Sequence, residues 1–94
     1  MDEPPLTQFL VEHYLPGATQ EDLRGASSRI ADATGDLALA GEPVHYLGST
    51  IVPAEESCFS LFESGSEATV RRALERAEVV YARIHVAEAV HPTS

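Results

Sequence analysis

The stretch FLVEHYLPGATQEDL, residues 9–23, holds the end of a predicted strand, a turn and the beginning of a predicted helix. Apolar and polar side chains alternate loosely over residues 6–15, which is typical of a β-strand. The Pro-Gly pair at 16–17 ends that strand. Thr19 is followed three residues later by Asp22, a spacing typical of a helix N-terminal cap. A strand that passes directly into a helix is therefore the first unit of the predicted fold.

Hydrophobic patterning predicts the remaining elements. Apolar residues recur every three or four positions in the helical stretches, whereas the other strands are rich in β-branched and aromatic residues. Glycine at position 35 is expected to weaken the first helix by about 1 kcal/mol relative to alanine. The predicted elements are a strand at 6–15, a helix from Thr19 to Gly41, strands at 43–52 and 58–63, a helix with an apolar stripe from Val70 to Ala77, and a strand at 84–90.

The order of these elements is βαββαβ, the pattern of the ferredoxin-like fold. It predicts an α+β domain with a four-stranded antiparallel sheet and both helices on one face. One domain spans residues 1–94, with flexible ends expected at 1–5 and 92–94. The uncovered sheet face favours pairing with a second copy, so we expect a homodimer that forms a dimeric α+β barrel.

Composition excludes several classes of function. The formal net charge of −9 opposes binding to nucleic acid or to an anionic membrane surface. The chain has no apolar run long enough to span a bilayer and no recognisable signal peptide, so a cytoplasmic location is expected. The single cysteine, Cys58, allows no internal disulfide and no four-cysteine zinc site. The sequence has no glycine-rich phosphate loop, so no nucleotide cofactor is expected.

The first strand places two candidate functional side chains on the open face of the sheet. Successive strand side chains point to opposite faces. If Phe9 and Val11 pack beneath the helices, Glu12 and Tyr14 point the other way. Glu88 would join Glu12 if the alanines of the last strand lay beneath the helices. For the strands at 43–52 and 84–90 the facing is left open by the pattern.

The same reasoning assigns the third strand. Phe59 and Leu61 are predicted beneath the helices. The alternate residues of that strand, Cys58, Ser60 and Phe62, are then expected on the open face.

Three functional hypotheses use these residues. The first is a divalent transition-metal site with Glu12, His45 and Glu88 as ligands, because imidazole and carboxylate suit nickel, copper or zinc. His13 is a further candidate ligand, although its place before a turn favours a half-exposed side chain without a role.

The second hypothesis is an enzyme in which Glu12, Tyr14, His45 and Glu88 form an acid–base pocket, as in a small cyclase, isomerase or oxygenase. Leu10, Tyr46 and Phe62 would bound that pocket. The third is a structural or regulatory dimer without a small-molecule site.

Four segments of the sequence, spread over nearly the whole chain from about Thr7 to Thr93, are similar to those of a known family. They are LVEHYLPGAT, VHYLGSTIVP, CFSLFE and RALERA…ARIHVAEAV. They resemble a family of small bacterial domains, some members of which are described as nickel-binding proteins. The resemblance implies a ferredoxin-like dimer and makes Ni²⁺ or a related divalent ion the candidate ligand. Family members often carry V-E-R-Y-L-P-G in the first strand, with His13 here in place of Arg. They also carry a Cys matched by Cys58 and a Glu matched by Glu88.

One departure from that pattern lies after the second helix. Relatives often have a Gly there and a Pro two residues later. This chain has Glu78 and Val80 at those positions.

Overall fold

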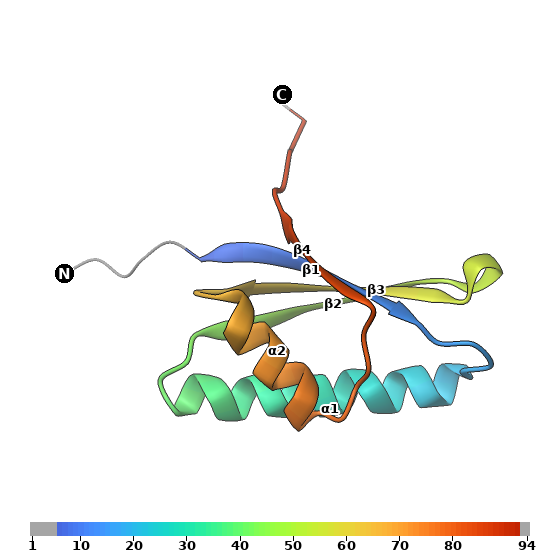
Figure 1. Ribbon diagram of the computed structural model, residues 1–94, viewed down its shortest axis with the longest axis horizontal. Coiled ribbons are helices and arrows are strands. Elements are labelled where there is room, and N and C mark those ends of the chain that lie inside the picture. The colour runs from blue at the N-terminus through green and yellow to red at the C-terminus, as the bar shows by residue number, and fades with distance from the viewer. Residues whose placement is uncertain (1–5, 93–94) are drawn as a thin grey trace.

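The computed structural model describes residues 6–92 and confirms the predicted βαββαβ order (Figure 1). The expected flexible ends, 1–5 and 92–94, lie outside the described residues except for Pro92. None of the helices among residues 6–92 is long and apolar enough to cross a membrane. The elements are β1 (Thr7–Tyr14), α1 (Gln20–Leu39), β2 (Val44–Val52), a short 3-10 turn η1 (Pro53–Glu55), β3 (Ser57–Ser64), α2 (Glu67–Arg76) and β4 (Arg83–Ala87).

The four strands form one antiparallel sheet in the order β2-β3-β1-β4. Both helices lie on one side of this sheet, and no helix covers the other side in Figure 1. We call the two sides the covered face and the open face. After β4 the chain rises away from the sheet on the open side, in contrast to the helices below it.

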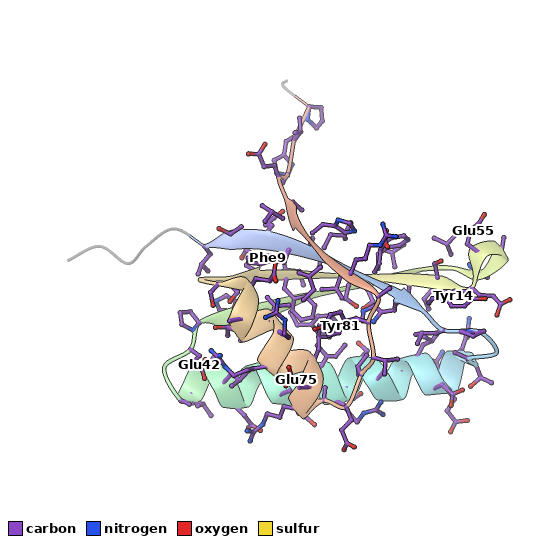
Figure 2. The ribbon with its side chains drawn as sticks, viewed as in Figure 1. Phe9, Tyr14, Glu42, Glu55, Glu75 and Tyr81 are labelled. Carbon is purple, nitrogen blue, oxygen red and sulfur yellow. The ribbon has the colours of Figure 1, made fainter. Side chains whose placement is uncertain are left out.

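The covered face and the helices enclose the hydrophobic core. Phe62, Val11 and Val44 from the sheet and Leu74 from α2 are at most 2 % exposed. Burial of each such side chain contributes about 1.5–3 kcal/mol to folding. Figure 2 shows side chains filling the space between the two layers, with Phe9 and Tyr81 among them.

The start of α1 follows the predicted cap. The Thr19 hydroxyl accepts a hydrogen bond from the Asp22 amide, and the Asp22 carboxylate accepts one from the Thr19 amide. This reciprocal pair satisfies two amides that have no partner within the helix. At the other end Gly41 adopts φ +90° and Glu42 N–H bonds to Leu37 O at 2.9 Å, so the helix ends in a glycine-type C-cap as expected.

The end of α2 uses the same cap without a glycine. Val79 N–H donates to Leu74 O at 3.0 Å, and Glu78 takes the left-handed conformation with φ +57°. This is the position at which the resembling family often has glycine. A side chain there costs free energy because its Cβ crowds the backbone in that conformation.

The last strand differs most from its predicted bounds, and β2 is irregular. The last strand ends at Ala87 rather than at residue 90, because its pairing with β1 stops at Gln8 and Ala87 and β1 itself begins at Thr7. In β2 the pairing register shifts between Tyr46 and Gly48, which marks a β-bulge. Gly48 has φ +119°, a conformation that only glycine adopts readily.

Candidate functional site

Glu12 and His85 lie side by side on the open face, on neighbouring strands β1 and β4. His85 Nε2 is 3.5 Å from Glu12 Oε1, and Arg83 Nε is 4.0 Å from Glu12 Oε2. The side chains of Glu12 and His85 are 37 % and 44 % exposed. The structure therefore brings one imidazole and one carboxylate together where solvent and ions can reach them.

The spacing of this pair fits a shared metal ion. Imidazole nitrogen and carboxylate oxygen bind such ions at about 2.0–2.2 Å, so two ligands of one ion can stand at most about 4.2 Å apart. The observed 3.5 Å lies within that limit. Nitrogen and oxygen ligands of this type suit nickel, copper and zinc. Among residues 6–92 of this single chain, no group of three or more His, Cys, Asp or Glu side chains could hold an ion. Further ligands would have to come from water or from another chain.

The other predicted ligands on the strands do not join Glu12 within the protomer. His45 is exposed on the open face opposite Glu63, in the row of residues that includes Gln8. Four residues of β1 separate that row from Glu12, which corresponds to about 13 Å. Glu88 is exposed and follows β4 instead of lying within it. Ala87 pairs with Gln8 and so lies on the open face, and the condition under which Glu88 would join Glu12, with the alanines beneath the helices, is not met.

His13, the further candidate ligand, lies on the covered face and is 3 % exposed, so the expectation of a half-exposed side chain is wrong. Its Nδ1 is 2.8 Å from Val80 O and its Nε2 is 3.0 Å from Ser60 Oγ. A carbonyl oxygen only accepts, so Nδ1 carries the proton and Nε2 accepts from the Ser60 hydroxyl. Burial lowers the pKa of His13, and the hydrogen bond to Val80 opposes part of that shift. Both ring nitrogens are thus occupied within the protein.

The facing predicted for β3 is wrong. Val11 and Phe9 pair directly with Ser60 and Phe62, and directly paired residues share a face. Cys58, Ser60 and Phe62 therefore lie on the covered face and are buried, whereas Phe59 and Leu61 lie on the open face. The sequence CFSLFE has a phenylalanine in each alternate set, so its pattern alone could not decide between the two faces.

This correction removes the acid–base pocket in the form predicted. Phe62 and Tyr46 pack against each other on the covered face, with ring centroids 5.4 Å apart. They cannot bound a pocket on the open face together with Leu10. Tyr14 is 62 % exposed, at the end of β1 opposite Ser57 (Figure 2).

His85, which contacts Glu12, is not among the site residues predicted from the sequence. It faces Leu10 across the β1–β4 pair, which places it diagonally from Glu12 on the same face. A register for β1 and β4 would have revealed this contact. That register depends on residues more than seventy positions apart, and the local pattern does not contain it.

Comparisons with known proteins agree with this fold. Residues 9–86 match the family model described as nickel responsive protein SCO4226-like. The crystal structure of SCO4226 from Streptomyces coelicolor A3(2) is similar, with a TM-score of 0.76 and 26 % sequence identity over 89 % of this chain and 99 % of that one. No curated protein matches the chain. The family match covers most of the sequence and the structural match covers the same fold, so the chain belongs to the SCO4226-like family of nickel-responsive proteins.

Proposed function

We propose that this protein binds a divalent transition-metal ion of the nickel type, with Glu12 and His85 as its first two ligands. The observation that carries the proposal is the 3.5 Å approach of His85 Nε2 to Glu12 Oε1 on an uncovered sheet face. Membership of a nickel-responsive family supports nickel as the ion. The net charge of −9 also favours the approach of cations.

The proposal includes a homodimer formed through the open face. Leu10 and Leu61 are paired neighbours on this face, and Phe59 lies beside them opposite Glu12. All three are only partly buried in the single chain, with no helix above them. A second copy would bury these apolar side chains and could supply the ligands that one chain lacks. His45 and Glu88 of the second copy are the candidates for that role. The cytoplasmic location stays a prediction.

Calorimetric titration of tag-free protein with Ni²⁺ tests the metal site. We expect binding tighter than about 100 μM, which corresponds to about −5.5 kcal/mol. The variants Glu12→Gln and His85→Gln should each weaken binding at least about tenfold, a loss of about 1.4 kcal/mol. His91→Gln is the matched control, because His91 is exposed beyond β4. Binding weaker than 100 μM, or equal loss in the control, would reject the site.

Sedimentation velocity tests the dimer. Leu61→Glu places a charge in the proposed contact and should give monomers. Leu39→Glu is the control, because Leu39 is 90 % exposed at the end of α1. A wild-type protein that stays monomeric at high micromolar concentration, with and without Ni²⁺, would contradict the dimer.

A further inference from the structure

A hollow lies on the opposite side of the sheet, between the first half of α1 and the covered face. It has a volume of about 280 Å³, near the lower end of the range for small-molecule sites. Apolar side chains from α1 and the sheet form most of its wall, including Leu23, Ile30 and Ile51. A second hollow continues it toward the β1–α1 turn and shares Leu15 and Cys58 with it.

We propose that this pocket binds a small, neutral, largely apolar molecule through a hydroxyl group that donates a hydrogen bond to a chain of serine oxygens. The phenols are the chemical class that fits best, since they combine an apolar ring with a strong O–H donor. This proposal is independent of the metal site on the open face.

The serine chain begins at the buried His13. Ser60 Oγ is 3.0 Å from His13 Nε2 and 2.8 Å from Ser49 Oγ. Ser49 Oγ is 2.5 Å from the Tyr46 hydroxyl, which is 2.9 Å from Ser27 Oγ on α1. Four hydroxyl groups and one imidazole thus form a continuous line along the pocket, and all members except Tyr46 are lining residues.

The donor and acceptor of every hydrogen bond in this line follow from the protonation of His13 at its end. His13 Nδ1–H donates to Val80 O, so His13 Nε2 can only accept, and Ser60 must donate to it. Ser60 then accepts from Ser49, because its only proton is used. By the same reasoning Ser49 accepts from Tyr46, which accepts from Ser27.

The consequence for a ligand is specific. Each hydroxyl proton in the chain is already donated, and the neutral Cys58 thiol, hydrogen-bonded with Ser49 and Ser60, can donate to one of those two oxygens. A free lone pair remains on the other of the two, and Ser27 accepts none of the bonds in the chain, so its oxygen is also free to accept. The polar wall can therefore accept a hydrogen bond and has no hydroxyl proton to give. A molecule with an O–H group satisfies it, whereas an ether or ketone of the same shape does not.

The pocket has little charge. No Asp or Glu is among the described residues that line the first hollow, and Arg24 at its α1 side is an exposed residue. Burial raises the pKa of the Cys58 thiol, so this side chain stays neutral at pH 7. A neutral ligand therefore fits this surface better than an anion or a cation.

The β-bulge in β2 builds the polar wall. Without the register shift at Gly48, Tyr46 and Ser49 would point to opposite faces of the sheet, because they are three residues apart. The extra residue brings both to the covered face, where they bond to each other. β-Bulges that re-aim a side chain are over-represented next to active sites, and this bulge turns Ser49 toward the hollow.

The test uses two probes that differ only at the oxygen: 4-ethylphenol and its methyl ether, 4-ethylanisole. Chelator-treated protein is titrated at pH 7.5 and followed by amide NMR shifts. We expect 4-ethylphenol to bind with Kd below about 1 mM, to shift the amides of residues 49 and 60, and to bind at least tenfold tighter than the ether. Ser49→Ala should reduce that preference, since it removes an acceptor and breaks the chain.

A pocket-filling variant serves as the second arm. Ala26→Phe adds a ring inside the hollow and should abolish binding of both probes. Ala31→Phe is the matched control, because Ala31 is exposed on the same helix and does not line the pocket. The proposal is overturned if neither probe binds at 5 mM, if both bind equally, or if Ala26→Phe leaves binding unchanged. None of these results depends on Ni²⁺, so this experiment and the Ni²⁺ titration of the metal site test the two proposals independently.

Discussion

Glu12 and His13 are adjacent in β1, yet one points to the open face and the other to the covered face. Glu12 lies beside an exposed imidazole and an arginine, and its carboxylate is accessible to ions. His13 is enclosed, with both ring nitrogens bonded within the protein. The comparison teaches that residue type alone does not show which side chain of this sheet is accessible to an ion. The face on which each side chain lies and the partners that it contacts decide that accessibility.

The largest effect expected from this comparison concerns two phenylalanines of β3. Phe62 is fully buried on the covered face, so Phe62→Ala should lower the free energy of unfolding by about 3–5 kcal/mol through lost burial and a cavity. Phe59 lies on the open face, and Phe59→Ala should cost no more than about 1.5 kcal/mol for the protomer. Urea denaturation at low protein concentration measures both. Equal losses would break the assignment of faces.

The next effect is a dependence of stability on pH that the buried His13 should cause. The pKa of His13 is lower in the folded protein than its usual 6.5, so the unfolded chain binds more protons between those two values. The free energy of unfolding therefore keeps the whole contribution of neutral His13 above pH 6.5. It should fall as the pH drops below 6.5, by up to about 1.4 kcal/mol per pH unit, until the pKa of His13 in the folded protein is reached.

Variants separate His13 from the other histidines. His13→Gln should flatten the acid side of the stability curve between pH 6.5 and 5, whatever its effect on stability at pH 7. His45→Gln, at an exposed position on the open face, is the matched control for the loss of an imidazole. A slope that survives in His13→Gln would show that another group causes it.

A smaller effect of opposite sign is expected where α2 ends and the loop begins that supplies the Val80 carbonyl to His13. Glu78→Gly relieves a left-handed backbone and should raise stability by up to about 1 kcal/mol. Glu75→Gly, at an exposed position in the last turn of α2, should lower stability by about 1 kcal/mol. Thermal or urea unfolding of the two variants checks the sign. A loss in both would contradict the cap.

The smallest effect concerns the competition between the Arg83 side chain and Ni²⁺ for the Glu12 carboxylate on the open face. Arg83 Nε stands 4.0 Å from the carboxylate and its side chain is 72 % exposed. An exposed pair of this kind contributes about 0.2–1 kcal/mol, so Arg83→Gln should tighten Ni²⁺ binding by no more than about fivefold. Arg72→Gln, on α2, is the control and should leave the affinity unchanged. Weaker binding in Arg83→Gln would mean that the carboxylate is not a ligand.

Local signals predicted most of the fold. The capping pair Thr19 and Asp22, the glycine at 41 and the helical stripes each act within a few residues, and the structure confirms them. The Glu12 side of β1 was also predictable, because Phe9 and Val11 mark the covered face.

What the pattern could not predict depends on contacts distant in sequence. The facing of β3 follows from its pairing with β1, and the contact of His85 with Glu12 follows from the register of β4. The line of hydroxyl groups depends on the bulge at Gly48, which shifts Ser49 to the face of Tyr46. Each of these features is set by strand pairing, which a linear pattern of apolar residues does not encode.

The most direct measurement is a titration of ¹⁵N-labelled, tag-free protein with paramagnetic Ni²⁺, read residue by residue. The ion broadens the signals of nearby amides, so it reports which face it occupies. We predict early, selective loss of the signals around Glu12 and His85 on β1 and β4, and no such loss in the double variant Glu12→Gln with His85→Gln. Loss centred on the covered pocket or on His91, or no selective loss at all, would contradict the account.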